Sequence, residues 1–246
     1  MKFGDLISNE SAFGKVMTRL GIVIAANVLF CLFSLPVFTI GAAYTALYHV
    51  MLKTLRGDEV INPFVQFWRG FKDNFKQATL CWIVLLAVAA FGAFDVYWCH
   101  QLGGFLTVFQ YAIYGVGLLL AIVALYLFPT MAAFRDTIPH LLRNAIYFAL
   151  HKPLHLIVIF FFHAVPIALT LSDPQYLPVY GFIWVTCGYG LIVLLGATLL
   201  LRQFVQYLPA VDSSGELIED ADGEDKGQAP ERSEAEILRE MEELGM

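Results

Sequence analysis

Residues 20–52 read LGIVIAANVLFCLFSLPVFTIGAAYTALYHVML, an apolar run of 33 residues with Ser34-Leu35-Pro36 near its middle. As one helix, the run would be about 50 Å long, whereas roughly 20 residues suffice to cross the hydrocarbon of a bilayer. Pro36 lacks a backbone N–H and its ring clashes with the preceding turn, so it ends or kinks a helix. The pattern predicts two helices, at about 20–34 and 40–55. They form two short crossings or a re-entrant hairpin; the alternative is one kinked, tilted helix.

Further apolar segments follow at residues 79–99, 106–133, 154–171 and 179–201. The whole chain is 59% hydrophobic and 15% charged, a balance outside the range of soluble globular domains. Long uninterrupted apolar runs also exclude the alternating pattern of a membrane β-barrel. We therefore predict an all-α, polytopic integral membrane bundle over residues 20–209, with five or six membrane segments, the first broken at Pro36.

The two ends of the chain differ from this apolar domain. Residues 1–19 place apolar side chains at mostly helical spacing between charges, which predicts an amphipathic segment lying at the membrane interface. Residues 210–246 carry 13 Asp and Glu against 3 Lys and Arg. Such a segment buries too little apolar area to order itself, so it is predicted to be an acidic, largely disordered cytoplasmic tail.

Basic residues indicate how the chain is oriented, because Lys and Arg are retained on the cytoplasmic side of a membrane. The loops at residues 53–76 and 134–153 are basic, whereas the turns between the second and third and between the fourth and fifth apolar blocks contain no Lys or Arg. This places both basic loops and the C-terminus in the cytoplasm. Lys2, Lys15 and Arg19 favour a cytoplasmic N-terminus too, which requires the first segment to double back.

Few polar side chains lie where they could act inside the bilayer. Asp95 lies near the outer end of its segment and His163 in the middle of another. Each has a structural interpretation, as an interfacial carboxylate or as a neutral histidine bonded to a neighbouring helix. The functional interpretation is a solute site at the broken segment, where unpaired N–H groups near Gly41 would hold an anion or a hydroxyl. The candidate solute or structural site comprises Pro36, Thr39, Gly41, Asp95 and His163.

The sequence contains no nucleotide-binding P-loop, no hydrolase or zinc-protease motif, and no basic patch suited to nucleic acid. The four cysteines lie in or at the ends of apolar segments without a C-x-x-C pair, which is typical of core residues. We predict a protein that is not an enzyme and that needs neither a metal nor another cofactor. An aromatic and basic stretch of the first cytoplasmic loop is the candidate partner surface: Phe67, Trp68, Arg69, Phe71, Lys72, Asn74 and Phe75.

Two stretches of the sequence carry a family resemblance. Asn27-Val28-Leu29-Phe30 leads into Ser34-Leu35-Pro36-Val37-Phe38-Thr39-Ile40-Gly41-Ala42-Ala43-Tyr44-Thr45-Ala46-Leu47-Tyr48, and Phe67 to Thr79 follows. Together they resemble the YesL-like family of bacterial integral membrane proteins, a domain of unknown function. The resemblance implies a multi-pass protein of the bacterial cytoplasmic membrane, encoded beside carbohydrate ABC-transporter components, glycan-degrading enzymes and sensor kinases.

Two functions follow as hypotheses. The first is a non-enzymatic accessory to carbohydrate uptake or sensing, whose partners are the lipid bilayer and, as the resemblance implies, transporter components or a sensor kinase. The alternative is a small solute transporter or channel, a homo-oligomer, with its site at the broken first segment. An intramembrane enzyme is a third class, but no nucleophile, base or metal set can be assembled for it.

Overall fold

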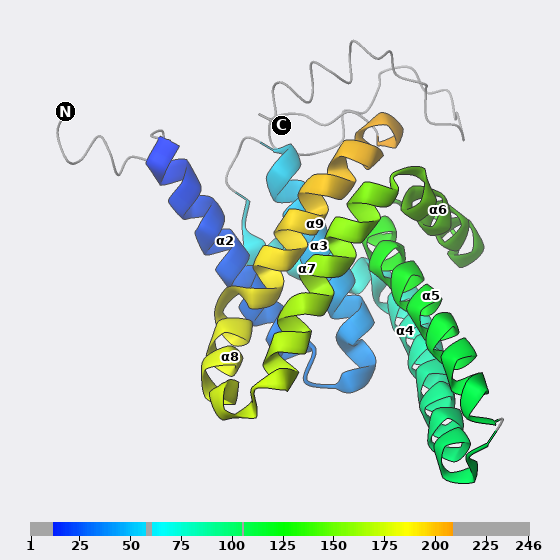
Figure 1. Ribbon diagram of the computed structural model, residues 1–246. Helices are drawn as coiled ribbons and strands as arrows, with labels where there is room; N and C mark the ends of the chain where they lie inside the picture. Colours follow the sequence, from blue (N-terminus) through cyan, green and yellow to red (C-terminus); the bar gives the residue numbers. More distant parts are fainter. Residues whose placement is uncertain (1–11, 58–60, 105, 209–246) are drawn as a thin grey trace.

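The computed structural model describes residues 12–57, 61–104 and 106–208. The predicted acidic tail, 210–246, lies outside the described residues, as does most of the predicted interfacial segment, 1–19. All regular elements of the described part are helical, and no strand occurs in it. The prediction of an all-α bundle is thereby confirmed (Figure 1).

The first apolar run forms two helices that pack against each other. Helix α2 spans Ala12–Phe33 and helix α3 spans Ile40–Arg56, with a short 3₁₀ turn, η1, at Val37–Thr39. In Figure 1, α2 descends from one end of the bundle and α3 returns toward that end. The predicted break at Pro36 is therefore confirmed, and the alternative of one kinked helix is excluded.

Local hydrogen bonds explain why the chain turns here. The Ser34 N–H still donates to the Phe30 carbonyl at 2.9 Å, but Pro36 has no N–H with which to continue the helix. The Thr39 hydroxyl lies 2.6 Å from the Phe33 carbonyl oxygen and 2.7 Å from that of Pro36. The carbonyls left over at the end of α2 thus find partners inside the turn, as helix ends require.

Helix α4 spans Pro63–Leu102 and is longer than the predicted segment at 79–99. Its 40 residues extend about 60 Å, roughly twice the thickness of the hydrocarbon. Asn62 caps its start, because the side-chain oxygen accepts the Phe64 N–H at 3.0 Å. The aromatic and basic stretch named as the candidate partner surface lies in the first third of this helix.

Helix α5, Leu106–Ala133, turns back along α4. The connection contains Gly103 and Gly104, whose φ angles of 63° and 62° lie in the left-handed region that favours glycine. The two helices form a hairpin that extends away from the other helices (Figure 1). The second half of α4 therefore has α5 as its main neighbour.

The rest of the chain completes the bundle. Helix α6, Ile138–His151, lies within the predicted cytoplasmic loop, and helix α7 spans Pro153–Ser172. After a 3₁₀ turn, η2 (Pro174–Tyr176), the predicted segment at 179–201 forms three parts: α8 (Leu177–Ile183), a π-helical segment η3 (Trp184–Gly188) and α9 (Tyr189–Phe204). A last 3₁₀ turn, η4, covers Val205–Tyr207.

The core forms around α3. Ala42, Ala43 and Ala46 are fully buried, and such small residues let neighbouring helices approach closely. α3 packs against α2, α4, α5 and α9. Helix α3, the shorter of the two helices formed by the first apolar run, is thus also the helix most enclosed by other helices.

Among the described residues, five helical stretches are long and apolar enough to cross a membrane: Phe13–Phe33, Pro63–Leu102, Thr107–Ala133, Pro153–Ser172 and Pro174–Tyr207. Helix α3 has 17 residues and is about 25 Å long. The described residues therefore contain the helices of a multi-pass membrane protein, and α3 is shorter than these five stretches.

Candidate functional site

The break in the first segment is closely packed against α4. A Cβ atom on Gly41 would lie 2.6 Å from the Trp82 Cβ and 2.8 Å from the Ala78 carbonyl oxygen. The Trp82 indole N–H also donates to the Val37 carbonyl at 2.7 Å, joining the turn to α4. The side of Gly41 that a side chain would occupy is therefore filled by α4 and α5.

Thr39 and Pro36 complete the description of this turn. Thr39 is buried and its hydroxyl already contacts two carbonyl oxygens of its own turn, whereas Pro36 is exposed. A hydroxyl has only one hydrogen, so Thr39 has no further proton to donate to a solute. Within the turn, these side chains have a visible structural role in closing the connection between α2 and α3.

His163 of α7 is bonded to α3. Its Nε2 lies 2.6 Å from the Tyr44 hydroxyl, and its Nδ1 lies 2.8 Å from the Ile159 carbonyl oxygen. Because a carbonyl only accepts, Nδ1 carries the hydrogen, and in the neutral ring Nε2 accepts from Tyr44. His163 therefore links the outer helix α7 to the central helix.

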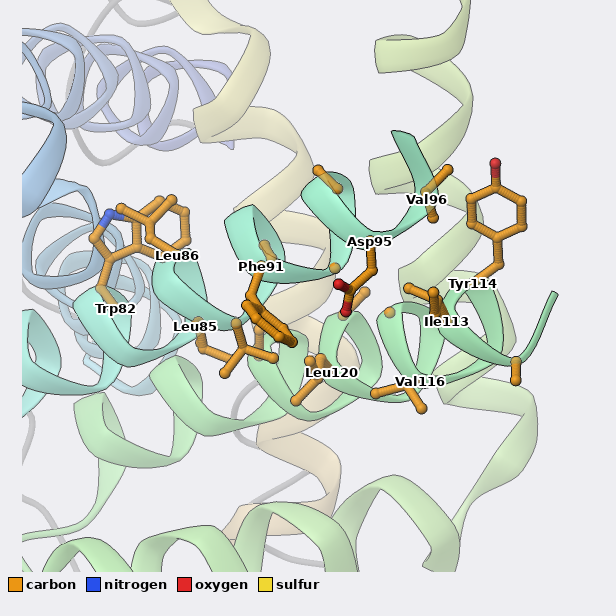
Figure 2. A pocket seen from close by; sticks show the side chains of 18 residues that line it. Trp82, Leu85, Leu86, Phe91, Asp95, Val96, Ile113, Tyr114, Val116 and Leu120 are labelled. Atoms are coloured by element: carbon orange, nitrogen blue, oxygen red, sulfur yellow. The ribbon is translucent and has the colours of Figure 1, made fainter. Parts of the chain in front are cut away.

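Asp95 lies elsewhere. It lines a cleft between α4 and α5, together with apolar side chains from both helices (Figure 2). Trp82, which contacts the break, lines the same cleft but precedes Asp95 by 13 residues, or about 20 Å of helix. The five residues of the candidate site therefore do not converge: Pro36, Thr39 and Gly41 form the turn, His163 bonds to Tyr44, and Asp95 belongs to the cleft.

The candidate partner surface divides into a buried and an exposed face. Phe67 and Phe71 are buried, and both rings contact Phe33 at the end of α2, with centroids 5.5 and 5.0 Å away. Trp68 is 54% exposed, and Arg69 and Lys72 are also exposed. A partner that approaches α4 would thus contact Trp68, Arg69 and Lys72 and not the two phenylalanines.

Asn74 and Phe75, the remaining residues of that surface, are half-buried. The Asn74 amide donates to the Gly70 carbonyl of its own helix at 3.0 Å, and the Phe75 ring packs near that of Phe71. Asp73, the residue before Asn74, forms an ion pair of 2.6 Å with Arg135, just beyond α5. The exposed face is consequently presented by a helix held on both sides.

Comparison with known proteins adds a partial match. A family model described as "Protein of unknown function, DUF624" matches residues 23–96, less than a third of the chain. Over these residues the chain is similar to DUF624. No curated protein and no solved structure matches the chain. The match supports an integral membrane protein of unknown biochemistry and assigns it no activity.

The region similar to DUF624 contains one residue whose role the sequence-based reasoning missed. Asn27 is fully buried in α2, and its amide donates to the carbonyls of Trp184 and Val185 at 2.9 and 2.8 Å. Both carbonyls belong to the π-helical segment, where the i→i−4 bonding of an α-helix is interrupted, and the asparagine bonds to them. The detectable signal was a single amide side chain within the apolar stretch at residues 20–33.

A second link also escaped the sequence analysis. The Gln203 amide nitrogen of α9 lies 2.9 Å from Nδ1 of His155, in the first turn of α7. Gln203 is buried, so this bond joins two helices at the end of the bundle opposite the α2–α3 turn. Among the described residues, no group of three or more His, Cys, Asp or Glu side chains could hold a metal ion.

Proposed function

We propose that the protein is a non-enzymatic accessory subunit of a membrane complex for carbohydrate uptake or sensing. The carbohydrate part rests on the YesL-like resemblance of the motifs around Pro36 and Phe67. The single observation that supports an accessory role is the exposed aromatic and basic face of α4, formed by Trp68, Arg69 and Lys72. Tryptophan and arginine are the residues most often found at the energetic centre of protein interfaces.

The packing beneath this face favours its use as a docking surface. Phe67 and Phe71 anchor α4 on Phe33, and Asp73, two residues after Phe71, pairs with Arg135. A surface held rigidly loses little conformational entropy when a partner binds. A transporter component or a sensor kinase with an acidic cytoplasmic loop would complement its charge.

Charge placement supports a cytoplasmic location for the face. The described Lys and Arg residues lie near the start of α2, in the last turn of α3, in the first third of α4, in the α5–α7 region and in the last turn of α9. The described residues of the α2–α3, α4–α5 and α7–α8 connections contain none. By the positive-inside rule, the first group of residues faces the cytoplasm. This orientation makes α3 a sixth crossing of a bacterial cytoplasmic membrane and places both ends of the chain in the cytoplasm.

The alternative, a solute transporter with its site at the broken segment, has less support. A Cβ atom on Gly41 would lie 2.6–3.0 Å from atoms of Trp82, Ala78 and Phe128, so this side of the turn is filled by protein. The Thr39 hydroxyl is already bonded, and Asp95 lies about 20 Å along α4 from Trp82. These observations favour the accessory role over transport through the turn.

Site-specific photo-crosslinking in native membranes tests the proposal. A photoreactive amino acid is placed at Trp68, and cross-linked proteins are identified by mass spectrometry. The same probe at Tyr111, an exposed residue of α5 outside this face, is the matched control. We expect a carbohydrate transporter component or sensor kinase to be enriched at residue 68 and lost in the Arg69→Glu, Lys72→Glu double variant. Equal products at positions 68 and 111 would reject the α4 surface.

A further inference from the structure

The α4–α5 hairpin contains a cleft that the proposed function does not use. It has a volume of about 880 Å³, within the range of about 300–1,000 Å³ that is typical of small-molecule sites. Its lining comes only from α4 and α5, and nearly all of it is apolar, including Leu85, Ala89, Leu120 and Ala121. Figure 2 shows the Asp95 carboxyl group directed into this space.

Asp95 is chemically isolated. It is the sole Asp, Glu, Lys or Arg between Lys76 and Arg135, and both of these lie toward the opposite end of the hairpin. Lys76 is 19 residues away along α4, or about 28 Å. Within the described part of the chain, no hydrogen bond or ion pair engages the Asp95 side chain. His100, the nearest basic side chain along α4, is exposed and does not line the cleft.

An isolated carboxylate among apolar side chains is costly unless a cation compensates it. Among the described residues no Lys or Arg forms an ion pair with Asp95, so a bound molecule can supply the complementary charge. The remaining lining accepts an apolar body. Phe91 lies one helical turn before Asp95 on the same face, where an aromatic ring adds an attraction for a cation.

We propose that the α4–α5 cleft binds an amphiphilic organic cation, with its charged group at Asp95 and its apolar body between the two helices. The stretch from Asp95 to Trp82, about 20 Å along α4, sets the length available to the apolar body. A small hydrophilic cation would gain only the charge contact, and an apolar anion would meet repulsion. The site therefore selects for positive charge and apolar area together.

Two glycines of α5 provide a matched test of the space itself. Gly117 lines the cleft and Gly115 does not, and a Cβ atom on either would meet no atom within 4 Å. Gly117→Leu should therefore fill the cleft without a clash in the protein. Gly115→Leu adds the same side chain to the same helix outside the cleft.

The experiment measures binding of tetraphenylphosphonium to the full-length protein in nanodiscs of zwitterionic lipid, by equilibrium dialysis against empty nanodiscs. Tetraphenylborate has the same shape with the opposite charge, and tetraethylammonium has the charge without the aromatic body. We expect saturable binding of tetraphenylphosphonium alone. Asp95→Asn should weaken it by about tenfold to a hundredfold, the range expected for loss of a charged contact.

The controls separate the site from general effects. Asp173→Asn, which neutralises an exposed carboxylate beyond α7, and Gly115→Leu should bind as the unaltered protein does. Gly117→Leu should bind more weakly. Circular dichroism and size-exclusion elution establish that each variant is folded. Binding that does not saturate, that is equal for tetraphenylborate, or that persists unchanged in folded Asp95→Asn would overturn the proposal.

Discussion

The side-chain oxygen of Asn27 in α2 accepts the backbone N–H of Gly190 in α9 at 2.7 Å. The same side chain donates to the Trp184 and Val185 carbonyls, so one residue satisfies three backbone groups around the π-helical segment. A Cβ atom on Gly190 would lie 2.9 Å from a Val23 methyl carbon and 3.0 Å from the Val23 carbonyl oxygen. Close approach and hydrogen bonding therefore act together to join α2 and α9.

Replacing Asn27 with Ala should destabilise the protein markedly, because it leaves three backbone groups without a partner in a buried site. We expect a loss of about 2 kcal/mol or more. Thermal unfolding in mild detergent measures it. Asn74→Ala is the control, since the Asn74 amide bonds only to its own helix and is half-buried. A shift for Asn27→Ala no larger than that for Asn74→Ala would contradict the role given to Asn27.

Adding one methyl group at Gly41 should be harmful. The new Cβ would meet the Ala78 carbonyl oxygen at 2.8 Å, and a backbone atom cannot move aside cheaply. We expect Gly41→Ala to cost about 1–3 kcal/mol, as overpacking does. Gly21→Ala, in α2 with no atom within 4 Å of the new Cβ, should be neutral or stabilising. Similar unfolding temperatures for the two variants would argue against close packing at the α2–α3 turn.

The close approach of Gly196 to Tyr48 predicts that a substitution at Tyr48 restores the stability lost by a substitution at Gly196. A Cβ on Gly196 would lie 2.7 Å from the Tyr48 hydroxyl oxygen. Gly196→Ala should therefore destabilise, whereas Tyr48→Phe removes the hydroxyl group that the new methyl group would meet. Combining both substitutions should recover most of the lost stability. A double-mutant cycle with strictly additive effects would show that the hydroxyl does not cause the clash.

The Tyr44–His163 bond predicts a spectroscopic change. Tyr44→Phe removes the donor to His163 Nε2, so the ¹⁵N resonance of this nitrogen should shift while Nδ1 stays protonated through the Ile159 carbonyl. Stability should fall by about 1 kcal/mol. Tyr111→Phe, at an exposed hydroxyl of α5, is the comparison. Identical histidine spectra for the two variants would place the Tyr44 hydroxyl away from the imidazole.

Part of the candidate site could be anticipated and part could not. Pro36 ends a helix for local steric reasons, so the break could be predicted from the sequence. Phe67 and Phe71 were predicted to share a partner surface with Trp68, but α4 turns them inward onto Phe33. Which face of a helix is buried depends on neighbours distant in the chain, and in a membrane protein apolar side chains occur on both faces.

The segment at 179–201 illustrates the same limit. Its hydropathy predicted a single crossing, but the structure places a π-helical segment at Trp184–Gly188. Nothing in these five residues requires that conformation. It forms where Asn27, more than 150 residues away, supplies hydrogen bonds to the freed carbonyls.

By itself, the sequence determined that the apolar segments belong in a lipid bilayer and that they are helical, because hydrocarbon forces each segment to satisfy its backbone hydrogen bonds internally. It also determined the turn at Pro36, because proline cannot continue a helix. Only the tertiary structure decided that α3 is the central helix, that Gly41 packs closely against α4, and that Asp95 lines the cleft between α4 and α5. These relationships arise from contacts between helices, and helix packing depends on close surface fit that an apolar composition leaves open.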